Sequence, residues 1–192
     1  YTSISDTLPM PVVEDEEFWN IITLGDWMLF QSLDRIYSYN LISKQFQWID
    51  AKTTKAHMFN VNGSIYFQNQ EKHVFKIENG KSIRAIDAEL VDFKSIVGMY
   101  NELNTLVIIL ENATFLRISD RGVSSMDTKL LKSTGDIIVY ATEKLKDGSY
   151  ALGTISDGLY QIDSNGYLIR SINRRNGLNN NTILCVFQDI DE

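Results

Sequence analysis

The feature that most constrains this chain is a repeated order of four short apolar or alternating runs, which returns at nearly constant spacing. The runs are rich in Ile, Val, Tyr, Phe and Trp and are separated by Gly, Asn and Asp, which is typical of β-strands joined by turns. The central residues of the third run in each unit are Tyr37, Phe75, Leu116 and Tyr160, which are 38, 41 and 44 residues apart. The sequence therefore predicts four successive four-stranded units.

Asn-Gly and Asp-Gly pairs lie between adjacent runs, where they suit tight two-residue hairpins that need positive φ at both central positions. The pairs are Asn62-Gly63, Asn79-Gly80, Asp147-Gly148 and Asn165-Gly166. Each unit is thus expected to be an antiparallel meander, whose apolar faces need a neighbouring unit to cover them. A repeat of about 40 residues that contains four strands is typical of a propeller blade. We predict an all-β chain, a β-propeller fragment of about four four-stranded antiparallel blades.

The repeat also predicts the domain organisation. Residues 1–17, which contain both prolines, are expected to be an extended N-terminal segment, and residues 18–192 a partial β-propeller. The predicted blades occupy approximately residues 18–50, 56–87, 96–127 and 137–172, with the start of a fifth at 183–192. Four blades leave two apolar sheet flanks open, so we expect contacts with the remaining blades of a longer parent chain and self-association through the exposed flanks.

Composition and charge narrow the class of protein further. The chain has 25 acidic and 18 basic residues, a net charge of −7, and an acidic surface repels phosphate, so we expect no nucleic-acid binding. Its apolar runs are far shorter than the roughly 20 residues needed to cross a bilayer, so we expect no direct membrane insertion by this segment. The single cysteine, Cys185, lies in an apolar run and is expected to be a small buried hydrophobe.

Two stretches resemble a known repeat. Residues 146–154 read KDGSYALGT and are followed by DGLY at 157–160, and residues 176–189 read NGLNNNTILCVFQD. Both resemble the two-component regulator propeller repeat, in which an N-G-L-x-x-N-x-(V/I) link leads into a strand, a D-x-(D/N)-G turn and a strand reading roughly L-W-x-G-T. The resemblance covers residues 137–189, whereas the first three units keep the strand rhythm without the signature.

Members of this family occur in the periplasmic sensor regions of hybrid two-component system sensor histidine kinase/response regulators. There, two seven-bladed propellers and a β-sandwich precede a transmembrane helix and a histidine kinase. The resemblance implies a seven-bladed, periplasmic parent anchored in the inner membrane, which senses a glycan or oligosaccharide and relays the signal to a kinase outside this chain, for transcription regulation. Two alternatives stay open: a protein-interaction or dimerisation scaffold that binds no ligand, and part of a propeller lyase or glycosidase.

Candidate catalytic and metal-binding residues are few. His57 and His73 lie on predicted strands without the Ser or Cys and carboxylate pairing that a nucleophile needs, so we predict no catalytic residue and no enzyme activity in this chain. The carboxylates at turns lack the spacing of a calcium loop, so we predict no metal and no cofactor. Several aromatic residues suit stacking on sugars, but their alternating strand positions favour packing between blades. They are Trp19, Trp27, Trp48, Tyr37 and Tyr39.

The predicted ligand-binding residues lie in a long polar link at residues 173–182, which joins the fourth blade to the fifth unit. Such links gather at one face of a propeller, where ligands and partners bind. We predict that Arg174, Arg175, Asn176 and Asn180 bind the ligand. The two arginines suit bidentate hydrogen bonds to a uronate or sulfate group, if the glycan is acidic.

Overall fold

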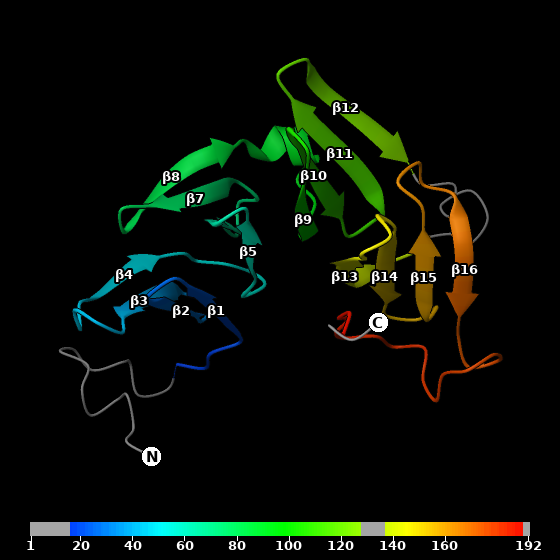
Figure 1. Ribbon diagram of the computed structural model, residues 1–192, viewed down its shortest axis with the longest axis horizontal. Helices are drawn as coiled ribbons and strands as arrows, with labels where there is room; N and C mark the ends of the chain where they lie inside the picture. The colour runs from blue at the N-terminus through cyan, green and yellow to red at the C-terminus, as the bar shows by residue number, and fades with distance from the viewer. Residues whose placement is uncertain (1–15, 128–136, 190–192) are drawn as a thin grey trace. The chain divides into compact units, whose positions relative to one another are not determined.

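The computed structural model describes residues 16–127 and 137–189, in which sixteen strands form four antiparallel four-stranded sheets (Figure 1). The first sheet comprises β1 (Asn20–Leu24), β2 (Trp27–Gln31), β3 (Arg35–Asn40) and β4 (Phe46–Asp50). The second comprises β5 (Met58–Val61), β6 (Ser64–Gln68), β7 (Val74–Glu78) and β8 (Lys81–Ile86). The third comprises β9 (Ile96–Glu102), β10 (Thr105–Leu110), β11 (Thr114–Ser119) and β12 (Gly122–Asp127). The fourth comprises β13 (Val139–Lys144), β14 (Tyr150–Thr154), β15 (Leu159–Ile162) and β16 (Leu168–Ile172).

Within every sheet the strands pair in sequence order, so each sheet is a meander of the propeller-blade type. The predicted fold class, all-β with about four four-stranded antiparallel blades, is confirmed. A single turn of 3-10 helix, η2 (Ala88–Val91), follows β8. Residues 1–15 of the expected N-terminal segment lie outside the described residues.

The tight turns follow from their residue types. Asn62 and Gly63, between β5 and β6, have φ of 49° and 76°, and Asn79 and Gly80, between β7 and β8, have φ of 50° and 73°. Positive φ at both central positions matches the right-handed twist of the flanking strands, and Asn and Gly are the residues that adopt it at low cost. The Asn-Gly pairs are therefore the reason for the register of these two hairpins. The same prediction was wrong for Asp147-Gly148 and Asn165-Gly166, where only the glycine has positive φ and the turns between the strands are longer.

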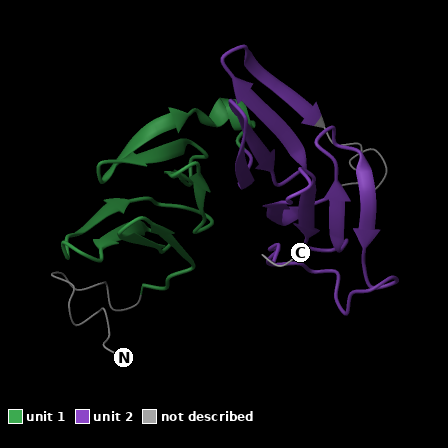
Figure 2. Cartoon of the chain, in the orientation of Figure 1, with its two compact units in different colours: residues 1–93 green, residues 94–192 purple. Residues whose placement is uncertain are grey.

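The chain divides into two compact units, residues 1–93 and 94–192 (Figure 2). In the first unit, alternate residues of the first sheet pack against the second sheet. Leu29 and Ile36 pack with Met58, Ile65 and Phe67, and all five are at most 4% exposed. Each such side chain contributes about 1.5–3 kcal/mol on burial, so this inter-sheet core is the main source of cohesion in the unit.

The second unit has an equivalent core between the third and fourth sheets. Val107, Ile109 and Phe115 of the third sheet pack with Tyr150 and Leu152 of the fourth, and none of the five is solvent exposed. The Tyr100 hydroxyl is 2.8 Å from the Thr142 hydroxyl, which also donates to the Val97 carbonyl, so polar contacts join the two sheets as well. Each meander is thus covered by its neighbour, as the repeat predicts.

The repeat signature of the fourth sheet has a structural explanation. A Cβ on Gly153 would lie 2.5 Å from the side chain of Ile183, so only glycine lets the segment after the link approach β14. The Thr154 hydroxyl donates to the Gly158 carbonyl at 2.8 Å and accepts the Asp157 N–H at 2.9 Å. The G-T and D-G pairs of the signature therefore build one turn and one close contact.

The segment after the link differs from a regular blade. Residues 183–189 form no strand, although Ile183 N–H donates to the Thr154 carbonyl at 2.8 Å and so holds the segment against β14. Residues 190–192 lie outside the described residues, so a fifth blade beginning at 183–192 stays a prediction. Cys185 is exposed, and the expectation of a buried cysteine was wrong because, within residues 16–127 and 137–189, no second sheet covers this apolar run.

Candidate functional site

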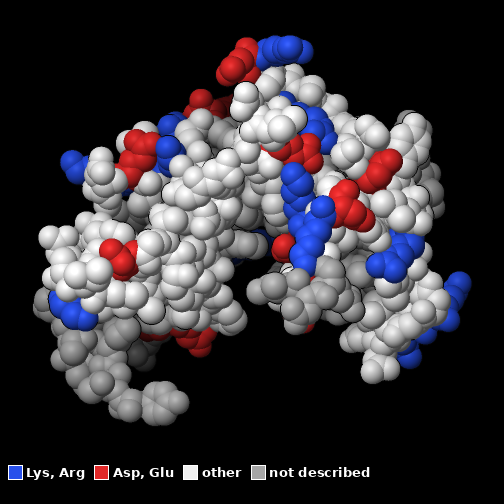
Figure 3. Space-filling view, in the orientation of Figure 1, with Lys and Arg blue, Asp and Glu red and all other residues white. Residues whose placement is uncertain are grey.

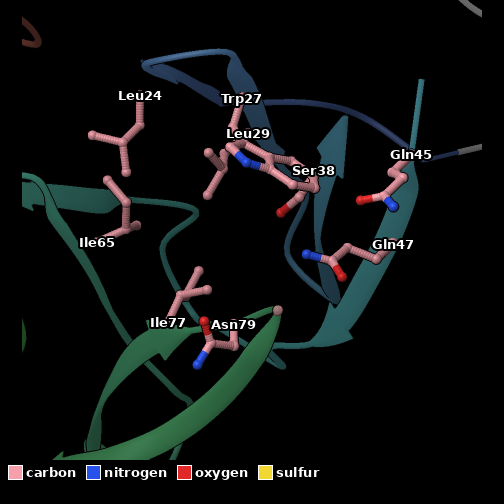
Figure 4. Close-up of a pocket in the computed structure, with 10 residues that line it drawn as sticks. Leu24, Trp27, Leu29, Ser38, Gln45, Gln47, Ile65, Ile77 and Asn79 are labelled. Carbon is pink, nitrogen blue, oxygen red and sulfur yellow. The ribbon is translucent and has the colours of Figure 1, made fainter. Parts of the chain in front are cut away.

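A pocket of about 380 Å³ lies between the first and second sheets, beside the β1–β2, β3–β4 and β7–β8 turns (Figure 4). Its floor is aliphatic, with Leu29 and Ile65 from the inter-sheet core. Its walls are polar and aromatic. They carry the indole of Trp27, the hydroxyl of Ser38 and the side-chain amides of Gln45, Gln47 and Asn79. We call it the amide pocket.

Strand register explains how these side chains come together. Ser38 on β3 lies directly opposite Leu29 on β2 and Gln47 on β4, so the three residues form one row across the first sheet. Ile36, two residues before Ser38, belongs to the inter-sheet core, so the row faces the second sheet. Asn79 reaches the same space from the β7–β8 turn of the second sheet. The pocket is thus a product of two adjacent meanders.

The polar groups of the amide pocket have unused hydrogen-bonding capacity. Ser38 is only 7% exposed, yet its hydroxyl has no hydrogen-bond partner in the described part of the chain. The same holds for the side-chain amides of Gln45, Gln47 and Asn79 within residues 16–127 and 137–189. The Ser38 hydroxyl is not among the buried polar atoms that lack a partner in the described residues, so it is open to the space of the pocket. These groups are therefore available to a bound molecule.

Gly80 gives the pocket its shape. A Cβ at this position would lie 2.3 Å from Oε1 of Gln47, so the Gln47 amide rests directly on the glycine backbone. The φ of +73° also favours glycine here, since it belongs to the left-handed region. The Asn79-Gly80 turn therefore both supplies a polar side chain and positions a second one.

Electrostatics separate the amide pocket from a second pocket of about 540 Å³ in the other unit. None of the residues that line the amide pocket is charged. The second pocket, which we call the charged pocket, includes Glu102, Lys144, Asp147 and Asp163. On the visible face of the second unit, blue and red side chains lie next to one another (Figure 3).

The charged groups of the charged pocket already have partners within the protein. Glu102 accepts hydrogen bonds from the Tyr150 hydroxyl and the Arg117 guanidinium, both at 2.5 Å, and lies 3.5 Å from Lys144. Burial raises the pKa of Glu102, but the bonds from Tyr150 and Arg117 outweigh it and hold the pKa below its usual value. Hydrogen bonds from Ser149 likewise lower the pKa of Asp147. This pocket is therefore a structural ion cluster rather than a set of free groups.

The four predicted ligand-binding residues are exposed in the link after β16. The Asn176 amide is engaged within the link, because its oxygen accepts Asn173 N–H at 2.6 Å and its nitrogen donates to the Ser171 carbonyl at 2.9 Å. The Asn180 side-chain oxygen accepts the Thr182 N–H at 3.2 Å. The backbone of Arg174 donates to the Asn181 side chain at 2.8 Å. These asparagines shape the link, and ligand binding by Arg174, Arg175, Asn176 and Asn180 stays a prediction.

The aromatic residues that suit sugar stacking fall into different environments. Tyr37 and Tyr39 are buried in an aromatic cluster on the other face of the first sheet. Trp19 and Trp48 are 66% and 42% exposed, and neither lines the amide pocket. Trp27 is half-buried and lines it, which the alternating strand pattern did not reveal.

His73, Asp87 and Glu89 bring potential metal-ligand atoms within 4.8 Å of one another. Nδ1 of His73, however, accepts the N–H of Ala88 at 3.1 Å, at the start of η2. A neutral imidazole nitrogen that accepts a hydrogen bond has no second lone pair for a metal. We therefore assign this group to the support of η2.

Comparisons with known proteins bear on the fold. No protein-family model matches the chain. In sequence, the chain is 27% identical to the tricorn protease of Thermoplasma volcanium over an alignment of 147 positions, which covers 74% of this chain and 13% of that protein. No described helix has the length and apolar character needed to cross a membrane.

In structure, the chain is similar to the extracellular domain of the hybrid two-component system BT4673 from B. thetaiotaomicron, with a TM-score of 0.64 and 16% identity. The match covers 91% of this chain and 25% of that domain, so the chain spans about a quarter of its length. The β-propeller domain of Cps50 (Swd1) from Myceliophteria thermophila matches 81% of this chain and 57% of that chain, with a TM-score of 0.53 and 13% identity. At these identities the likeness shows the fold, a β-propeller, and the sheets described above are its blades.

Proposed function

We propose that this chain is part of the extracytoplasmic sensor of a hybrid two-component system and binds a glycan or oligosaccharide. The observation that carries the proposal is the likeness of nine tenths of the chain to the extracellular domain of such a system. The repeat signature at residues 137–189 supports it independently, because it resembles a repeat of sensors of this type. In this proposal the parent lies in the periplasm, anchored in the inner membrane.

The role is binding and signal relay rather than chemistry. Neither His57 nor His73 contacts a serine hydroxyl or a cysteine thiol in the described residues, so no nucleophile and base pair supports an enzyme. Ligand binding would favour one arrangement of the sensor and shift the population of states that reaches the kinase. The kinase itself lies outside this chain.

The experiment is ligand-dependent phosphorylation of the parent protein in membrane vesicles. We expect an oligosaccharide to bind the parent, measured by isothermal titration calorimetry, and to change the rate of kinase autophosphorylation. Two results would refute the proposal: no oligosaccharide binding by the parent, or turnover of the glycan or a peptide by the parent. Turnover of a glycan would instead support the alternative of a propeller lyase or glycosidase, and turnover of a peptide would agree with the 27% identity to a protease.

A second role, as an interaction scaffold, is favoured by exposed apolar side chains on and after β16. Ile169 is 53% exposed, Leu184 63% and Phe187 78%. Because open apolar sheet faces are normally covered, we propose that another blade of the parent or a second copy of the chain packs here. Light scattering of the isolated chain tests this, with association that rises with concentration as the expected result. A monomer at all concentrations up to the millimolar range would refute the self-association.

A further inference from the structure

We propose that the amide pocket binds one uncharged sugar unit of the ligand, with the Trp27 indole against the ring and the polar side chains on its hydroxyls. This inference rests on the proposed function, because it names the ligand class and the site of the proposed glycan binding. The pocket's volume of about 380 Å³ lies at the lower end of the range of ligand sites, which is about 300–1,000 Å³.

The first argument is the match of hydrogen-bonding groups. A sugar hydroxyl both donates and accepts, so it pairs best with side chains that also do both. Ser38, Gln47 and Asn79 each have a donor and an acceptor, and none of these side chains is engaged elsewhere in the described chain. Figure 4 shows the Ser38 hydroxyl and the Gln47 amide close to each other, with the Asn79 amide beside Ile77 on the other side of the pocket.

The second argument is the position of the Ser38 hydroxyl, a polar group that a mostly buried residue presents to the pocket. Nine tenths of this residue is buried, and the hydroxyl faces a pocket rather than a protein acceptor. A serine at this position weakens an otherwise apolar core, since Ile36 and Leu29 beside it belong to the inter-sheet cluster. A ligand hydroxyl would satisfy the group and offset that cost.

The third argument is the apolar side of the pocket. The C–H face of a pyranose or furanose ring is apolar and packs on aromatic rings, while its rim of hydroxyls needs polar partners. Trp27, with Leu24 and Ile77 nearby, provides such a surface opposite the amides. A purely apolar ligand would leave the amides unpaired, and a fully polar one would leave the indole uncovered.

The fourth argument is charge. A uronate or sulfate group carries a negative charge that needs a cation or several donors when it leaves water. Among the described residues, none that lines the amide pocket is a lysine, arginine or histidine. The pocket therefore favours a neutral sugar, in contrast to the acidic glycan for which the arginines of the link would be suited.

The test uses calorimetry with two probe sets, on the 192-residue chain and on the parent that contains it. The neutral set contains malto-, cello-, xylo-, manno- and fructo-oligosaccharides, and the acidic set contains oligogalacturonides and sulfated chondroitin oligosaccharides. The variants are Ser38→Ala, Gln47→Ala and Asn79→Gly. Each removes one polar group, and loss of one hydrogen bond weakens binding by about 2- to 12-fold.

Matched controls separate binding from folding. Asn62→Gly alters an Asn-Gly turn with nearly the same φ as Asn79-Gly80 but outside the pocket, so it should leave affinity unchanged. Gln70→Ala removes an exposed amide that does not line the pocket. Ser38→Ala should not lower the unfolding temperature, because the hydroxyl it removes has no protein partner in the described residues.

The outcomes are distinct. Binding of a neutral oligosaccharide that the three pocket variants weaken and the two controls do not would support the inference. Neutral binding that the pocket variants leave unchanged would overturn the inference while the proposed function stands. Binding of the acidic set alone would also overturn it and would point to the arginines of the link. Binding of neither set, in the chain or the parent, would overturn both the inference and the proposed function.

Discussion

Gly158 and Gly148 provide a matched test of how the fourth blade is built. Both have a left-handed backbone, with φ of +87° and +82°. They differ in the space around them: a Cβ on Gly158 would lie 2.2 Å from the Ile172 carbonyl oxygen, whereas a Cβ on Gly148 would meet nothing within 4 Å. Alanine at either position would therefore adopt a similarly strained backbone conformation. Only at Gly158 would its Cβ also collide with another strand.

The magnitudes follow from these two terms. A non-glycine residue in the left-handed region costs about 1–2 kcal/mol, so Gly148→Ala should destabilise the protein by that amount. At Gly158 the backbone of β16 must also move, and steric overpacking typically adds about 1–3 kcal/mol. We therefore expect Gly158→Ala to reduce the free energy of unfolding by about 2–5 kcal/mol.

Hydrogen exchange measured by mass spectrometry is the suitable assay, because it reports on the second unit separately from the first. Gly158 N–H donates to the Asn181 carbonyl at 2.9 Å, so Gly158→Ala should also reduce protection in the link at residues 173–182. Gly148→Ala should leave the link unchanged. Equal destabilisation by the two variants, or a greater loss from Gly148→Ala, would refute the reasoning.

Three further predictions concern the second unit. Tyr150→Phe should lower the free energy of unfolding by about 1–3 kcal/mol in urea titrations, since the half-buried, charged Glu102 loses a hydrogen-bond donor; an unchanged midpoint would contradict this. The pKa of Glu102 is lower in the folded state than in the unfolded chain. The charged carboxylate therefore stabilises the fold at pH values above its unfolded-state pKa, and this stabilisation is lost as the pH falls through its folded-state pKa. Glu102→Gln should therefore be less stable than the wild type at neutral pH, with a gap that narrows on acidification, and a gap independent of pH would exclude this role. Exposed Cys185 should react with a maleimide in the native protein as fast as in urea, whereas protection until unfolding would show it to be buried.

Much of the fold could be predicted from the sequence because it depends on local chemistry. The alternation of apolar residues indicates the strands, Asn62-Gly63 and Asn79-Gly80 determine two of the hairpins, and the near-constant period indicates the blades. Local contacts also explain two residues of the repeat signature in the fourth unit. Gly153 leaves room for Ile183, and the Thr154 hydroxyl donates to the Gly158 carbonyl. Ligand binding by the link asparagines stays a prediction, and the structure shows that the Asn176 side chain holds the link together.

The candidate site could not be predicted in this way, because no sequence period says what lies opposite a strand face. Ser38 and Gln47 are neighbours only through the register of β3 and β4, and Asn79 joins them from a different blade. Alternation of apolar residues correctly indicates that Trp27 faces the core between the two sheets. It does not indicate that a pocket lies beside Trp27. Similarly, the apolar run around Cys185 signals a strand, yet burial requires a neighbouring sheet. The sequence by itself thus determined the strands, turns and blades, whereas only the packing of one blade on the next decided where unpaired polar groups meet to form a pocket.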